Sequence, residues 1–130
     1  SEEVMGWEVS KSGLKIVLSP GVPHYTRGML PGPLKDFLAQ HNLKLGEIRH
    51  WVSHPGGPKV IDALEEGLAL PAGTLNRTRQ SLAEIGNLSS TSVLIILEEW
   101  LRDRIAKPGD WGMMLSMGPG FCAEAALLRW

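Results

Sequence analysis

The fold is decided by residues 48–68, which read IRHWVSHPGGPKVIDALEEGL. The apolar run at 48–53 is typical of a buried strand, and the prolines and glycines around His54 end it. Apolar residues then recur with helical spacing over 58–68, where a proline is tolerated in the first turn. A strand that enters a helix through a glycine-containing loop indicates an α/β fold, and it places His54 at the carboxyl end of the strand.

Outward from this unit, predicted strands and helices alternate along the chain. Further strands are predicted at residues 4–9, 14–19, 111–117 and 121–130. Further helices are predicted within 22–43, which Pro31 and Pro33 divide, over 74–85 with Gly86 as a left-handed cap, and after Asn87, where Ser89, Ser90 and Thr91 are candidate caps. Hairpin-like strand pairs near both ends favour a single domain, residues 1–130, with a mixed sheet.

Composition and charge exclude several classes of protein. The chain has 130 residues, 43% of them hydrophobic, which is enough for one globular core. Because 13 Lys and Arg balance 14 Asp and Glu without a basic block, no nucleic-acid partner is expected. The longest apolar run, residues 93–97, is far shorter than the roughly 18 residues of a membrane span, so no membrane partner is expected.

The single cysteine and the start of the chain carry further expectations. One cysteine excludes an internal disulfide and favours a reducing, intracellular setting. Because Cys122 lies in an apolar predicted strand and not at a helix N-terminus, we expect it to be a buried small hydrophobic residue, not a nucleophile. The chain has neither an initiator methionine nor a leader-like segment and opens almost directly into a strand, so we expect a fragment of a longer protein.

Four histidines are present, and a metal site is not expected among them. His50 and His54 have an i, i+4 spacing, which serves one metal ion only on a helix. Their segment is predicted to be extended, which would separate them by about 13 Å. Cysteine and carboxylate ligands with compatible spacing are also scarce.

Two polar residues occupy positions suited to chemistry, and each also has a simpler interpretation. His54 ends a strand beside two glycines, where it would line a crevice, but it could equally cap a helix or bond a carbonyl. Asn87 precedes a buried helix, where asparagine is a common cap, although its amide could also donate to a developing oxyanion. Spacing alone does not establish that the two side chains meet. The Gly-Pro-Gly segment at 118–120 is by itself only a tight turn.

Taken in order, these motifs resemble those of a known family. They comprise residues 54–62 (HPGGPKVID), 86–90 (GNLSS), 110–112 (DWG) and 118–120 (GPG). The set is similar to the C-terminal half of the type III polyketide synthases, the chalcone and stilbene synthase family, over essentially all 130 residues. The resemblance implies half of a thiolase-like fold, with α/β/α layers around a five-stranded mixed sheet. It also implies that the nucleophilic cysteine belongs to an N-terminal half that these residues do not include.

The resemblance also implies an activity and a set of site residues. Family members load an acyl group from coenzyme A and extend it with malonyl-CoA by decarboxylative Claisen condensation, so acyl-CoA and malonyl-CoA are the expected partners. In that reaction His54 and Asn87 match the histidine and asparagine that hold the thioester oxygen, and the histidine also keeps the cysteine as a thiolate. Residues matching the binding of coenzyme A or substrate are Gly56, Gly57, Ser89, Leu14, Ile16, Gly118, Pro119 and Gly120, and Trp7 is expected to narrow the cavity.

Further expectations concern the protein as a whole. The resemblance implies a cytoplasmic homodimer that needs no cofactor besides its coenzyme A thioester substrates. The 130-residue chain by itself should be inactive, since it lacks the nucleophile, and it should self-associate through the apolar face that meets the missing half.

Departures from the family pattern leave alternatives open. Ser116 and Met117 stand where Gly-Phe is common, and Ile85 stands where tyrosine is common, which affects product identity more than the catalytic pair. One alternative is a non-catalytic thiolase-like module that binds or assembles. Another is an enzyme similar to the ketoacyl synthase that starts fatty-acid synthesis, although the residues after His54 argue against it.

Overall fold

The computed structural model describes residues 3–130, and every predicted strand and helix is present within them. In chain order the elements are β1 (Met5–Ser10), β2 (Gly13–Leu18), α1 (Val22–Met29), α2 (Pro31–Gln40), the 3-10 helix η1 (Leu45–Glu47), β3 (Ile48–Ser53), α3 (Pro58–Gly67), α4 (Asn76–Glu84), α5 (Ser90–Asp103), β4 (Trp111–Gly118) and β5 (Cys122–Arg129). The predicted strand at 48–53 has the predicted bounds, and the break between α1 and α2 falls at Pro31 as expected.

The main sheet contains three strands in the order β3-β4-β5. β3 pairs with β4 in parallel, from Ile48 opposite Trp111 to Ser53 opposite Leu115, and β4 pairs with β5 antiparallel. The sheet is therefore mixed, as predicted. Because β3 and β4 are parallel, their carboxyl ends meet at the same end of the sheet, where loops can build a site.

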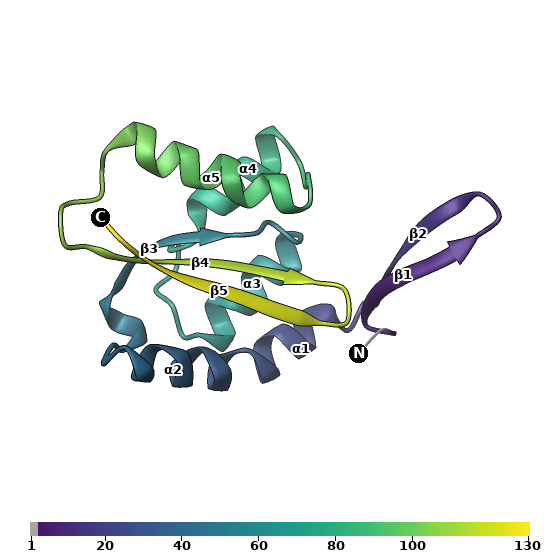
Figure 1. Cartoon of the computed structure of the whole chain (residues 1–130), viewed down its shortest axis with the longest axis horizontal. Coiled ribbons are helices and arrows are strands. Elements are labelled where there is room, and N and C mark those ends of the chain that lie inside the picture. The colour runs from purple at the N-terminus through teal and green to yellow at the C-terminus, as the bar shows by residue number, and fades with distance from the viewer. Residues whose placement is uncertain (1–2) are drawn as a thin grey trace.

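Helices cover both faces of this sheet, which gives the predicted α/β/α layers (Figure 1). On one face, Trp51 of β3 and Met113 of β4 pack with leucines of α2 and α3 in the largest buried cluster. On the other face, Val52 packs with Val93 and Ile96 of α5. Trp51 and Val52 are both almost fully buried, so β3 is covered on both sides, as its continuous apolar run indicates.

The predicted five-stranded sheet is wrong in one respect, because the five strands form two separate sheets. β1 and β2 pair with each other along their whole length, from Met5 opposite Leu18 to Ser10 opposite Gly13. α1 then begins only a few residues later, at Val22. The base of the hairpin is fixed by a small cluster of Val4, Val22 and Val60, and the rest projects from the body (Figure 1).

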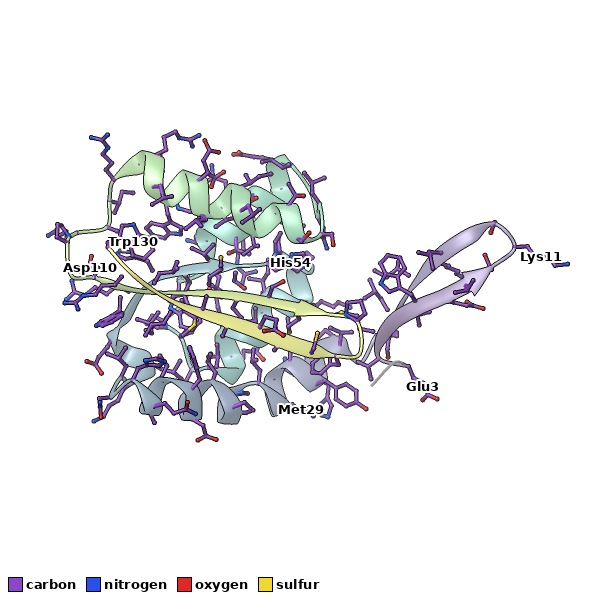
Figure 2. All side chains as sticks on the ribbon, in the orientation of Figure 1. Glu3, Lys11, Met29, His54, Asp110 and Trp130 are labelled. Atoms are coloured by element: carbon purple, nitrogen blue, oxygen red, sulfur yellow. The ribbon has the colours of Figure 1, made fainter. Side chains whose placement is uncertain are left out.

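A dense cluster of aromatic residues closes the amino end of the main sheet. The ring of His50 lies between Trp100 and Trp130, and its Nε2 is 2.8 Å from Oδ2 of Asp110. Figure 2 shows that Asp110 and Trp130 lie at the opposite end of the sheet from His54. In the part of the chain that the structure describes, no helix is long and apolar enough to cross a membrane.

Candidate functional site at the carboxyl end of the sheet

A cavity of about 220 Å³ opens at the carboxyl ends of β3 and β4. Three segments far apart in the sequence line it: the end of β3, the start of α5, and the turn from β4 into β5. Its lining residues are His54, Ser89, Ser90, Ser116, Met117, Gly118, Pro119, Cys122 and Glu124. His54 lies at this end of the sheet in Figure 2. The lining is rich in groups that can hydrogen-bond to a ligand: an imidazole, three serine hydroxyls and a carboxylate.

His54 is fixed by the strand that precedes it. Its backbone N–H donates to the carbonyl oxygen of Leu115 at 2.8 Å, which continues the β3–β4 pairing by one residue. Its carbonyl oxygen accepts the N–H of Gly56 at 3.0 Å, which turns the chain toward α3. Sheet pairing thus fixes the backbone that carries the imidazole, and the loop that follows His54 turns the chain toward α3.

The environment of His54 favours the neutral imidazole. Burial lowers the pKa of His54 below its ordinary value of 6.5, because removal from water disfavours the charged ring, and a backbone hydrogen bond with Ser89 partly opposes this shift. Nδ1 is buried and has no hydrogen-bond partner among the described residues. A neutral ring offers one N–H donor and one acceptor nitrogen, so it can donate to an oxygen of a bound molecule.

Asn87 lies in a strained turn at the start of α5. Its Oδ1 accepts the backbone N–H of Ser89 at 2.9 Å. Ser89 has φ 58° and ψ −135°, a backbone conformation that residues other than glycine rarely adopt. Ser89 is the N-cap of α5 but makes no side-chain cap hydrogen bond. The Asn87 carboxamide uses its oxygen within the turn, which leaves its Nδ2 as the end suited to donate to a ligand.

The structure brings some of the predicted site residues together and leaves others apart. His54, Ser89, Gly118 and Pro119 line one cavity. Asn87 is exposed, two residues before Ser89, and is not among the lining residues. Gly56 and Gly57 lie outside the cavity lining, in the loop after His54, and Leu14 and Ile16 are exposed on the hairpin. Gly120 lies in the β4–β5 turn, and its N–H donates to the carbonyl oxygen of Met5 at 2.7 Å.

The prediction that Cys122 is buried is wrong. Cys122 is exposed and lines the same cavity as His54. Its strand β5 is paired only with β4 in the main sheet, so residues 122–125 are exposed on both faces. The thiol donates to the carbonyl oxygen of Pro119 at 3.4 Å. An apolar strand sequence indicates burial only when other elements cover both faces, which does not hold for this end of β5.

Sequence reasoning also missed the roles of other lining residues. Ser116 and Met117 were noticeable only as departures from the Gly-Phe of the resembling family, and both line the cavity. Glu124 gave a signal, since it is a charge flanked by apolar residues in a strand sequence whose other charge, Arg129, lies at the far end. Nothing in the sequence marked Ser90 as a lining residue, because it was only a candidate cap of the helix after Asn87.

The histidines do not form a metal cluster in the structure. Within residues 3–130, no three His, Cys, Asp or Glu side chains are placed to hold a metal ion. His50 and His54 lie at opposite ends of the extended β3 segment, and His50 is instead hydrogen-bonded to Asp110.

Comparison with known proteins places this chain in a family. All residues, 1–130, match the C-terminal domain of the chalcone and stilbene synthases. The chain is 48% identical, over its full length, to 1,3,6,8-tetrahydroxynaphthalene synthase of Streptomyces peucetius subsp. caesius, of which it covers 34%. It is 32% identical over 124 residues to 3,5-dihydroxyphenylacetyl-CoA synthase of Amycolatopsis orientalis, covering 95% of this chain and 34% of the relative.

A solved structure agrees with this assignment. The 1,3,6,8-tetrahydroxynaphthalene synthase of Streptomyces coelicolor, described as a bacterial type III polyketide synthase, superposes with a TM-score of 0.92 at 27% identity. The match covers 99% of this chain and 37% of that one, so the chain spans about a third of the length of its relatives. The predicted resemblance is confirmed: the chain belongs to the chalcone and stilbene synthase family, as a C-terminal domain with half of its thiolase-like fold.

Proposed function

We propose that the protein containing this chain is a type III polyketide synthase that extends an acyl-CoA starter with malonyl-CoA by decarboxylative Claisen condensation. The observation that carries the proposal is the placement of His54 in a cavity with Ser89 and the Gly118-Pro119 turn, in a chain of this family. His54 and Asn87 are the proposed catalytic residues. Ser89 and the 118–120 turn would line the substrate cavity.

The two catalytic residues act on one oxygen atom in the proposed reaction. The bond between the malonyl carboxylate and the α-carbon breaks, carbon dioxide leaves, and the electron pair forms an enolate with negative charge on the thioester oxygen. An N–H of His54 and the Nδ2 of Asn87 donate hydrogen bonds to that oxygen as the charge develops. One such donor is worth about 3–4 kcal/mol of transition-state stabilisation.

The proposed carbon–carbon bond forms in the next step. The enolate carbon attacks the carbonyl of an acyl group held as a thioester on a cysteine, and the cysteine sulfur leaves as a thiolate. A thiolate beside the His54 ring favours the imidazolium, which opposes the effect of burial on the pKa of His54. In the proposed cycle, the His54 ring would therefore be charged while the cysteine is a free thiolate and neutral while the cysteine carries the acyl group.

We propose that this nucleophile lies on a part of the protein outside these 130 residues. Two observations support that view. The chain spans about a third of its relatives' length, with 34% coverage of each of the two synthases named above. Cys122 is accessible, but it lies in strand β5, with the carbonyl of Pro119 as the hydrogen-bond partner of its sulfur at 3.4 Å, and not at a helix N-terminus, where a thiolate would be stabilised. Replacement of Cys122 by serine should therefore leave acylation of the enzyme intact.

The loop after His54 is the proposed contact for the coenzyme A arm. Gly57 has φ 143°, and the space beside it is open, so its backbone is accessible to a ligand from that side. Leu14 and Ile16 would form part of the cavity wall with Trp7, on the apolar face of the hairpin. The remaining proposals for the whole protein are that it is a cytoplasmic homodimer and that it needs no further cofactor.

A more specific proposal concerns the product. The 48% identity to a 1,3,6,8-tetrahydroxynaphthalene synthase supports the same product for this protein. The full-length protein, assayed with malonyl-CoA and a panel of acyl-CoA starters, should then yield that naphthalene. Formation of 3,5-dihydroxyphenylacetyl-CoA, the product named for a 32% identical relative, would contradict the assignment.

The decisive experiment measures malonyl-CoA decarboxylation by full-length protein carrying His54→Gln or Asn87→Ala. Each variant should lower the rate by at least about 10²-fold, the typical loss of one oxyanion donor. His41→Gln, at the exposed histidine that follows the last residue of α2, is the matched control and should retain the parent rate. Normal rates in both site variants would refute the roles of His54 and Asn87 and favour a non-catalytic, assembling module.

A further inference from the structure

A buried serine supports the turn that carries Asn87. Ser92, in the first turn of α5, is only 1% exposed. Its Oγ accepts the backbone N–H of Leu88 at 2.8 Å, and its own N–H donates to the carbonyl oxygen of Ser89 at 3.1 Å. Ser92 is therefore bonded to the turn at two successive residues, once through its side chain and once through its backbone.

The support is needed because the turn lacks the usual one. Ser89 occupies the N-cap position without a side-chain cap bond, and its backbone has a positive φ of 58°. Such a conformation persists only where surrounding bonds enforce it. The bonds on this turn include those of Ser92, the one from the Ser89 N–H to Oδ1 of Asn87 at 2.9 Å, and the one between the His54 ring and the Ser89 backbone.

These bonds determine which end of the Asn87 carboxamide faces outward. The Ser89 N–H can bond only the oxygen of the carboxamide, so it assigns Oδ1 to the turn and Nδ2 to the outside. If the turn relaxed, Ser89 N–H would move away from Oδ1 and the carboxamide could rotate. An oxyanion donor is effective only when its orientation is set before the charge develops.

We propose that Ser92 is a positioning residue, whose hydroxyl holds the Leu88–Ser89 backbone so that Asn87 presents Nδ2 to the reacting oxygen. This inference rests on the proposed role of Asn87. Ser92 is not among the residues that line the cavity, and its side chain is buried beside Val93. Its effect passes through two hydrogen bonds within one helical turn.

The test uses malonyl-CoA decarboxylation by the full-length protein, with kcat and KM measured separately. Ser92→Ala removes the acceptor for the Leu88 N–H and should lower kcat about tenfold, a fraction of the roughly 10²–10³-fold loss from removing an oxyanion donor itself. KM for malonyl-CoA should stay within twofold. Thr91→Ala, at an exposed residue of the same turn, is the control and should leave both constants unchanged. Ser92→Cys keeps the side chain's shape with a weak acceptor and carries the test if the alanine variant fails to fold.

A double-mutant cycle separates positioning from a general effect on folding. In an Asn87→Ala background, Ser92→Ala or Ser92→Cys should cause no further loss of kcat, because there is no carboxamide left to orient. An equal loss in both backgrounds would overturn the proposal, as would parent-like kcat in both Ser92 variants. If Asn87→Ala itself retains the parent rate, the proposed function fails; if only the Ser92 variants do, the positioning role alone fails.

Discussion

At the scale of single residues, His54 combines a fixed backbone with a ring whose charge depends on its surroundings. Sheet pairing to Leu115 holds the backbone, and burial lowers the pKa of the ring from 6.5. The site residues that sequence alone could identify were those fixed by backbone geometry, at a strand end and before a helix. Cys122 and Glu124 were not identifiable in this way, because their exposure depends on which elements cover β5.

The lowered pKa of His54 predicts a pH dependence of stability. Because the folded pKa lies below the unfolded value, the unfolded chain binds more protons between the two. The contribution of His54 to stability is therefore fully present above about pH 6.5, the unfolded value, and is lost as pH falls through the folded pKa. Thermal unfolding midpoints of the 130-residue chain and of His54→Gln between pH 7.5 and 5 should differ in slope, with the variant less sensitive. The lowered pKa values of Asp103 and Asp110 act below pH 3.8, outside this window. Equal slopes would show that burial of His54 does not persist in solution.

Gly112 predicts a steric effect at the other end of the sheet. A Cβ at this position would overlap the ring of Trp130 and lie 3.1 Å from the carbonyl oxygen of His50. Gly112→Ala should lower the free energy of unfolding by about 1–3 kcal/mol, as overpacked core substitutions do. Gly28→Ala is the matched control, since Gly28 lies in α1 with open space around it and should gain about 0.5–1 kcal/mol from helix propensity. Urea denaturation measures both; an unchanged Gly112→Ala would show that Trp130 moves freely.

At the scale of elements, the sequence predicted which segments are strands and that β1–β2 and β4–β5 pair as hairpins, but not that β1 and β2 form a separate sheet. Period and turn residues specify a strand locally, and β3 was predicted with its observed bounds. Pairing depends on long-range geometry, and the chain returns from β2 into α1 within a few residues, so β1 and β2 do not join the main sheet. The hairpin has one apolar face, on which Trp7 lies opposite Ile16 and Val9 opposite Leu14.

The hairpin should be the least stable element of the isolated chain. A two-stranded hairpin without a packed face is marginal in water, and Val9 and Leu14 are 82% and 69% exposed. At concentrations low enough to keep the 130-residue chain monomeric, amide hydrogen exchange should therefore be fast throughout β1 and β2 and slow in β3 and β4, which are covered by helices. Equal protection of hairpin and sheet would mean that another surface already covers the hairpin in the isolated chain.

At the scale of the whole molecule, the body and the hairpin have opposite characters. The body buries its sheet between helices, whereas the hairpin presents large apolar side chains to solvent, with Trp7 at 55%, Ile16 at 50% and Leu18 at 53% exposure. The opposite hairpin face pairs Glu8 with Lys15 and is suited to water. An exposed apolar face such as that of Trp7, Ile16 and Leu18 normally lies against another surface.

The isolated chain should therefore self-associate through the apolar face of the hairpin. Its net charge of −1 provides little repulsion between copies, so association should be governed by concentration. Sedimentation velocity across a concentration series should show a species larger than 130 residues for the parent chain. Val9→Thr with Leu14→Thr places strand-favouring but polar side chains on this cross-strand pair and should shift the chain toward monomer. Lys15→Thr, on the opposite face, is the matched control and should leave association unchanged. If the apolar-face variant and the control associate alike, the contact lies elsewhere, on the body and not on the hairpin.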